Sequence, residues 1–106
     1  MSSFTPVDSQ DALKLIEEGA VVADIRDPGS FSHGRVKGAV SLSNENLQEF
    51  IDNADFDKPI IVCCYHGVSS QSAAAFLADR GFEKVYSLNG GFEGWALSMP
   101  DQVERG

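Results

Sequence analysis

The sequence lacks any apolar run near the roughly 20 residues that a membrane-spanning helix requires. Its first residues, 1–6, also lack the basic and apolar regions of a secretory signal peptide, so we expect a cytoplasmic protein. The chain has 106 residues, and 42% of them are hydrophobic. A chain of this length and composition predicts one domain, residues 1–106, built around a single core.

Basic residues are scarce. Eight Lys and Arg stand against sixteen Asp and Glu, which gives a net charge of −8. This balance argues against general nucleic-acid binding, whose affinity comes from neutralised phosphates. A small anionic substrate would have to be held by local groups, against the electrostatic field of the whole molecule.

Potential metal ligands and disulfide partners are also few. The cysteines are Cys63 and Cys64, and the histidines are His33 and His66. Neighbours on a strand point to opposite faces, so a disulfide between the two cysteines would be strained. The spacing of these four residues does not match a zinc motif, and we expect no metal. What remains is a structural thiol, a reactive thiol, or one of each.

Apolar runs alternate with segments of helical periodicity. The predicted strands are 20–25, 39–42, 59–64 and 83–88. The predicted helices begin at Asp8 or Ser9, at Asn44 or Asn46, at Ser70, and after 89–91, with a turn and one helical turn at 27–31. This order predicts an α/β fold: a mostly parallel central sheet of about five strands, flanked by helices on both faces.

Cys64 closes the strongest predicted strand, and ligands of open α/β sheets bind beyond the carboxyl ends of the strands. A short loop between this strand and the next helix would point unpaired N–H groups inward. Those donors and the helix dipole favour a thiolate. Gly67 would let the loop turn tightly. We expect Cys64 to be a nucleophile in an anion-binding loop and Cys63 to be an inert thiol of the core.

The segment Cys64-Tyr65-His66-Gly67-Val68-Ser69-Ser70 resembles the active-site loop of the rhodanese family, in particular of its small single-domain thiosulfate sulfurtransferases. The resemblance covers nearly the whole chain. Residues 22–27 are similar to the family's apolar-D-x-R strand end, residues 31–39 to its F-x-x-G-H-I-x-G-A segment, and residues 89–95 to its G-G-x-x-x-W motif. Arg35 and Lys37 depart from the second motif, which is mainly structural in the family.

The resemblance implies a two-step sulfur transfer without a cofactor. The Cys64 thiolate would attack the outer sulfur of thiosulfate, release sulfite and hold a persulfide. Cyanide in an assay, or a thiol such as a thioredoxin-like dithiol in cells, would then accept the sulfur. The residues implied in substrate binding are Tyr65, His66, Gly67, Val68, Ser69 and Ser70.

Several side chains near this loop leave two interpretations open. His66 either donates to a bound anion or has no role. Ser69 and Ser70 either contact the substrate or, as we favour, cap the following helix.

Outside the loop, Arg26 could attract thiosulfate, but the favoured interpretation is an ion pair with Asp24, Asp27 or another acid near the end of the sheet. Arg35 and Lys37 could steer an anion, although exposed cations usually do nothing so specific. Trp95 is expected in the core, on a packed helix with Phe92 and Leu97.

Three other functions compete with sulfur transfer from thiosulfate. A cysteine-dependent phosphatase or arsenate reductase needs an arginine six residues after the cysteine, where this chain has Ser70. A non-catalytic binding module would be expected to lack the nucleophile. A carrier that delivers persulfide sulfur to a partner protein would use the same residues.

Overall fold

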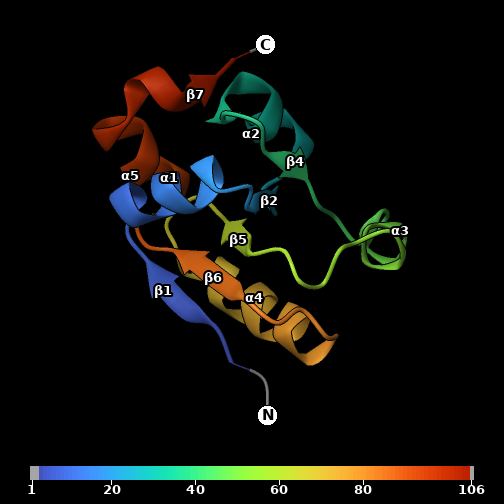
Figure 1. Cartoon of the computed structure of the whole chain (residues 1–106). Coiled ribbons are helices and arrows are strands. Elements are labelled where there is room, and N and C mark those ends of the chain that lie inside the picture. Colours follow the sequence, from blue (N-terminus) through green and yellow to red (C-terminus); the bar gives the residue numbers. More distant parts are fainter. Residues whose placement is uncertain (1–2, 106) are drawn as a thin grey trace.

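The computed structural model describes residues 3–105 and is built on a five-stranded sheet (Figure 1). The strand order is β1-β6-β5-β2-β4, and every neighbouring pair is parallel. The strands are β1 (Thr5–Val7), β2 (Val21–Asp24), β4 (Val40–Ser41), β5 (Ile60–Cys63) and β6 (Val85–Leu88). A second, antiparallel sheet pairs β3 (Arg35–Val36) with β7 (Val103–Glu104). The helices are α1 (Ser9–Glu17), α2 (Pro28–His33), α3 (Leu47–Asp52), α4 (Ser69–Asp79), α5 (Gly91–Ser98) and the short 3₁₀ helix η1 (Pro100–Gln102).

The predicted α/β fold with a parallel sheet is confirmed, and the boundaries differ in a few places. The strand predicted to end at Cys64 ends at Cys63, so the prediction that Cys64 is the last strand residue is wrong by one position. The edge strand β1 was not predicted, because it is three residues long, contains Pro6 and buries only Val7. β3 and β7 have two residues each, too few to show a periodic pattern.

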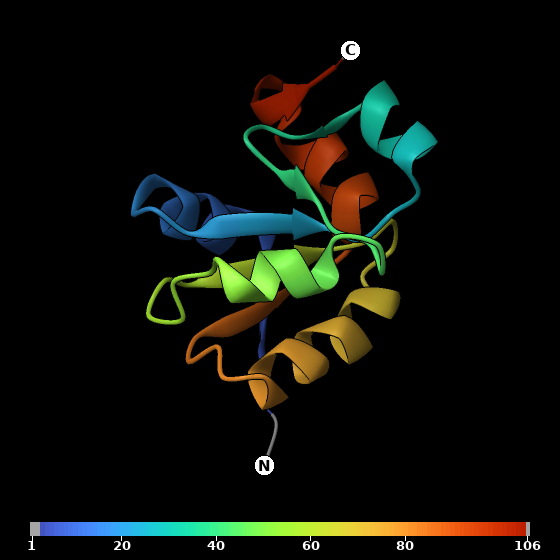
Figure 2. The ribbon, with the colours of Figure 1, turned by 90° about the vertical axis from the view of Figure 1, so that its right-hand side faces the viewer.

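Two cores form because side chains alternate along the strands. From β5, Ile61 and Cys63 enter the core shared with α1 and α5, while Ile60 and Val62 enter the core shared with α3 and α4. Seen along the sheet, α5 and α4 lie on opposite sides of the strands (Figure 2). All four residues of β5 are buried, which makes this strand a rigid support for whatever follows it.

Trp95 is 1% exposed in the first of these cores, as predicted, and its indole Nε1 donates to the carbonyl of Gln102 at 3.0 Å. The accompanying prediction for Leu97 is wrong, because this side chain is 81% exposed. The eight residues of α5 present one face to the core, and Leu97 lies on the other. Within residues 3–105, no helix is long and apolar enough to cross a membrane.

Candidate active site

Cys64 is the first residue after β5, and its side chain is received by the loop that follows. The backbone N–H groups of Gly67 and Ser70 donate to Cys64 Sγ at 3.1 and 3.3 Å. The residue is 5% exposed, at the carboxyl edge of the sheet. The predicted loop with amides directed at the sulfur is therefore present.

These donors decide the ionisation of the thiol. Burial alone would raise the pKa of Cys64, but hydrogen bonds from Ser70, Gly67 and His66 to the sulfur lower this pKa below its ordinary value. A lowered pKa increases the thiolate fraction, and the thiolate is the nucleophilic form.

The amides of α5 hold the loop from its other side. The N–H of Phe92 donates to the Cys64 carbonyl at 2.7 Å, and the N–H of Glu93 donates to the Tyr65 carbonyl at 3.1 Å. In a trans peptide the C=O and the following N–H point in opposite directions. With the Tyr65 carbonyl turned toward α5, the N–H of His66 is turned toward the sulfur, which it helps to ionise.

This close approach requires glycine at position 91. A Cβ there would lie 2.5 Å from both the Cys64 and the Tyr65 carbonyl oxygens, and the φ of Gly91 is +58°. The sequence resemblance included this glycine pair, but sequence reasoning missed its role in positioning the loop. The signal that could have found it is the pair itself, Gly90-Gly91, at the start of a helix.

Gly67 makes the tight turn that the sequence predicted. Its φ is +89°, and a Cβ at this position would lie 2.8 Å from the Gly90 nitrogen. Its carbonyl accepts a hydrogen bond from Gln71 Nε2 at 3.0 Å. The loop is thus tied to both helices that begin beside it, α4 and α5.

The two serines do not cap α4, contrary to the prediction. The N-cap position is Val68, which is 71% exposed, and no side chain forms a capping hydrogen bond there. Ser70 is fully buried, and its hydroxyl pairs with the hydroxyl of Ser87 on β6 at 2.8 Å. Ser69 lies at the mouth of the pocket that contains Cys64.

The side chains of Tyr65 and His66 lie on the outside of the loop. The His66 ring contacts the Glu93 carboxylate, with Nδ1 and Oε1 3.1 Å apart, and both side chains are at least half exposed. The Tyr65 ring meets the His66 ring edge to face at 4.5 Å. His66 therefore faces the sulfur through its backbone N–H, while its imidazole is engaged by α5.

Arg26 forms the predicted ion pair with Asp24. Its Nη2 lies 2.6 Å from Asp24 Oδ2, and the two side chains are 7% and 0% exposed. The same nitrogen donates to the Gly34 carbonyl at 2.7 Å, and the guanidinium stacks 4.3 Å from the centre of the Phe92 ring. Arg26 lines the Cys64 pocket, but its charge is balanced by the carboxylate of Asp24.

The pocket at Cys64 has a volume of about 370 Å³ and is bounded by the loop, the end of β2 and the start of α2. Of the described residues, neither Arg35 nor Lys37 lines it. Arg35 instead donates to the Phe31 carbonyl at 3.1 Å and pairs with Glu104 at 3.7 Å.

Cys63 occupies the core position predicted for it. It is 0% exposed, and burial and the nearby Asp24 carboxylate raise the pKa of its thiol. Within residues 3–105, no cluster of three or more His, Cys, Asp and Glu side chains could hold a metal ion.

Comparisons with known proteins identify relatives of this chain in sequence and in fold. Residues 8–98 match the family model described as a rhodanese-like domain. The chain is 53% identical to the thiosulfate sulfurtransferase GlpE of Ectopseudomonas mendocina and 50% identical to that of Pseudomonas entomophila, in each case over all of this chain and 97% of the relative. Among solved structures, it is similar to reduced Bacillus anthracis CoADR-RHD, with a TM-score of 0.82 and 25% identity over 94% of this chain and 18% of that one. It is also similar to a rhodanese-related protein of Thermoplasma volcanium, with a TM-score of 0.77 and 25% identity over 91% and 94% of the two chains.

Proposed function

The chain belongs to the rhodanese family, and we propose that it is a thiosulfate sulfurtransferase, a single rhodanese-like domain in which Cys64 carries the transferred sulfur as a persulfide. The observation that carries the proposal is the pair of backbone N–H groups, from Gly67 and Ser70, that donate to Cys64 Sγ. The full-length curated relatives bear the name of this activity, which supports thiosulfate as the sulfur donor.

In the first step, the Cys64 thiolate attacks the outer sulfur of thiosulfate. A bond forms between Sγ and that sulfur, while the S–S bond of thiosulfate breaks and leaves its electron pair on sulfite. The product is a persulfide anion on Cys64. Its negative charge lies beside the amides that already hold the thiolate, so these groups stabilise both the nucleophile and the product.

In the second step, an acceptor removes the terminal sulfur and the Cys64 thiolate returns. With cyanide the product is thiocyanate, and with a thiolate it is an acceptor persulfide. In the cytoplasm, where thiols stay reduced, a thioredoxin-like dithiol would serve as acceptor. A partner protein that takes the sulfur directly would use the same intermediate.

The loop residues have different roles in the proposed reaction. His66, Gly67 and Ser70 act through their N–H groups on the sulfur. Tyr65 and Ser69 line the mouth through which thiosulfate enters. Val68 is exposed next to that mouth and occupies the N-cap position of α4.

A cysteine-dependent phosphatase is a poorer fit to this site. Its dianionic transition state requires a guanidinium clamp. The corresponding position holds Ser70, whose hydroxyl pairs with Ser87, and residues 65–70 include no lysine or arginine.

The test is incubation with thiosulfate, followed by intact-mass measurement and an assay of thiocyanate after addition of cyanide. The wild-type protein should gain one sulfur atom on Cys64, removable by cyanide or a reductant. Cys64→Ala should gain none and should lose turnover by about 10³-fold or more. Sulfur loading of the Cys64→Ala variant would contradict the assignment of the nucleophile.

A further inference from the structure

A second, larger cavity opens beside the Cys64 pocket. It is a groove of about 670 Å³ between the end of β2, the segment before α3, and α4. The groove and the Cys64 pocket share three lining residues, Ile25, Arg26 and Asp27. A molecule lying in the groove would therefore reach the mouth of the site that holds the sulfur.

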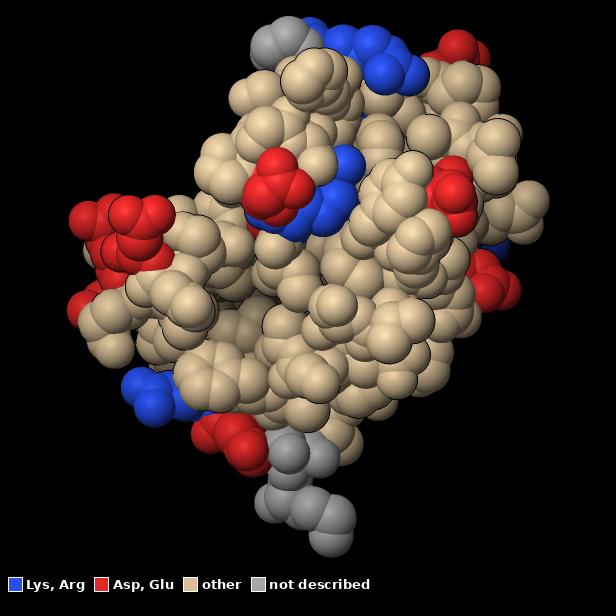
Figure 3. All heavy atoms as spheres, turned by 180° about the vertical axis from the view of Figure 1, so that it is seen from behind, with Lys and Arg blue, Asp and Glu red and all other residues tan. Residues whose placement is uncertain are grey.

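The groove is apolar along most of its length, with a few polar groups at its rim. Figure 3 shows a hollow walled by uncharged side chains on the rear face of the molecule. The apolar lining includes Ile25, Pro28, Leu42, Leu47, Phe76 and Leu77. Phe76 is a large apolar side chain that remains 44% exposed on α4. Sites for small organic molecules have this volume and this mixture of apolar walls and sparse polar groups.

The charged residues that line the groove, Arg26 and Asp27, offer little to an anion. The guanidinium of Arg26 is already paired with Asp24, and Asp27 is exposed where the groove meets the Cys64 pocket. Thiosulfate, a small dianion, gains nothing from such walls. The groove suits an uncharged molecule, and in the proposed reaction the sulfur acceptor is the substrate that can be uncharged.

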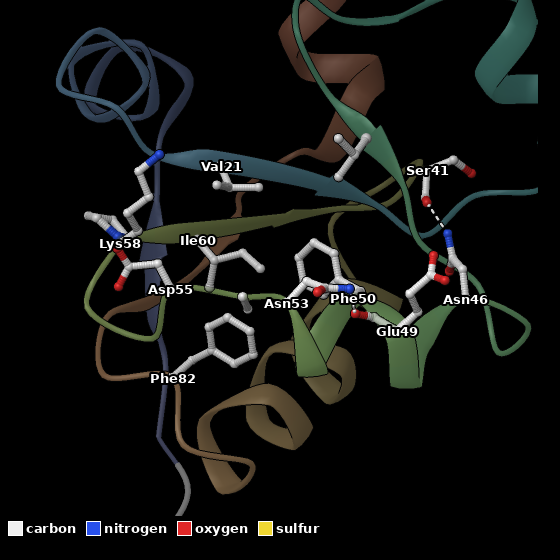
Figure 4. Close-up of a pocket in the computed structure, with 13 residues that line it drawn as sticks. Val21, Ser41, Asn46, Glu49, Phe50, Asn53, Asp55, Lys58, Ile60 and Phe82 are labelled. Atoms are coloured by element: carbon white, nitrogen blue, oxygen red, sulfur yellow. Dashed lines mark hydrogen bonds between the residues drawn. The ribbon is translucent and has the colours of Figure 1, made fainter.

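A third cavity gives a useful contrast. It has a volume of about 460 Å³ and lies beneath α3, where Phe50, Ile60 and Phe82 meet Lys58 and the other labelled residues (Figure 4). It shares no lining residue with the Cys64 pocket or with the groove. Unlike this third cavity, the groove combines an apolar surface with access to the sulfur.

We propose that the groove binds the uncharged hydrocarbon body of a low-molecular-weight thiol, the acceptor of the persulfide sulfur. This inference rests on the proposed function. The acceptor's thiol would pass its proton to the Cys64 persulfide anion, and the resulting thiolate would form a bond to the terminal sulfur. The S–S bond to Cys64 would break with its electron pair on Sγ, which leaves the acceptor as a persulfide and Cys64 as a thiolate.

The test uses ω-mercaptoalcohols, HO–(CH₂)n–SH, of increasing chain length as acceptors for the thiosulfate-loaded protein. These thiols are uncharged apart from the sulfur, and beyond the shortest members they differ mainly in hydrocarbon length. Each methylene buried in the groove should raise the second-order rate constant of sulfur transfer by about two- to fourfold. A rate constant that does not change with chain length would overturn the proposal.

Two variants locate the effect. Phe76→Gln should flatten the dependence on chain length, whereas Leu97→Gln, which replaces an 81% exposed leucine on α5, should leave it unchanged. Equal slopes in the two variants would overturn the proposal. A second result would also overturn the proposal. If the wild type shows no dependence on chain length and Phe76→Gln loses only the transfer of sulfur to reduced thioredoxin, the groove binds a protein and not a small thiol.

Cyanide separates this inference from the proposed function. It is too small to use the groove, so its rate should be the same in the wild type and in both variants. If the wild type turns over cyanide but shows no dependence on chain length, the groove proposal fails and the sulfurtransferase stands. If thiosulfate does not load Cys64 at all, the proposed function fails as well.

Discussion

Two adjacent cysteines in this molecule meet opposite environments. Cys63 is the last residue of β5, and its side chain lies in the core beneath α1 and α5, opposite Asp24 in the neighbouring strand. Cys64 is one residue further, and its sulfur accepts hydrogen bonds from two backbone amides. Both residues are nearly inaccessible, at 0% and 5% exposure. The direction of the nearby N–H groups, and not burial alone, therefore separates a reactive thiol from a structural one.

The difference in reactivity between Cys64 and Cys63 should decrease most when the α5 amides no longer hold the loop in place. In Gly91→Ala the new Cβ would come within 2.5 Å of the Cys64 and Tyr65 carbonyl oxygens, so the loop has to shift. Because displacements of about 1 Å in a catalytic site can cost about 100-fold in rate, we expect sulfur loading of Cys64 to slow by about that factor. The measurement is the rate of loading from thiosulfate, followed by intact mass.

Gly90→Ala provides the matched control. Gly90 also has a positive φ, +75°, but a Cβ there would meet only the Gly94 Cα, at an ordinary 3.6 Å. Both variants carry the backbone strain of alanine in the left-handed region, about 1–2 kcal/mol. Only Gly91→Ala should also slow loading. If both variants load at the wild-type rate, the amides of α5 do not position the loop.

The next effect concerns pH. Since the hydrogen bonds lower the pKa of Cys64, the wild type should keep its loading rate down to a pH below the ordinary thiol pKa of about 8.5. In Gly91→Ala the midpoint should move upward, because a displaced loop aims fewer N–H groups at the sulfur. Thiolate absorbance and loading rate should titrate together. A wild-type midpoint at the value of a free thiol would contradict the role of the amides.

The sequence predicted those features of the site that depend on residues close together in the chain. Residue types within a short stretch predict the buried strand β5, the loop after it and the positive φ of Gly67. An ion pair of Arg26 with a nearby acid was also foreseen, and its partner is Asp24, the last residue of β2 and two positions earlier in the sequence.

Features that depend on distant segments were not foreseen. The amides of Phe92 and Glu93 reach the loop across more than 25 residues of sequence, and Ser70 bonds to Ser87 instead of capping its own helix. The groove likewise brings Leu47 of α3 close to Phe76 of α4. No local pattern encodes such contacts, because they arise only once the sheet places these elements at one edge.

The smallest expected effect tests Cys63 itself. Because its folded-state pKa is raised, the folded protein retains a proton there that the unfolded chain loses above about pH 8.5. Its contribution to stability is therefore complete at lower pH and declines as the pH rises past that point. For Cys64 the folded-state pKa is lowered, so its contribution is complete above the unfolded pKa and declines as the pH falls through the folded value.

Cys63→Ala should load sulfur at nearly the wild-type rate, because its side chain faces the α1 and α5 core and not the Cys64 pocket. It should lose about 1 kcal/mol of unfolding free energy near neutral pH, since a buried sulfur is removed. Between pH 8 and about pH 10 it should lose less stability than the wild type, whereas Cys64→Ala should lose more. Urea unfolding at a series of pH values measures the change in stability of each variant and of the wild type. If both variants differ from the wild type in the same direction, the two thiols experience similar environments, against the contrast that the backbone amides create.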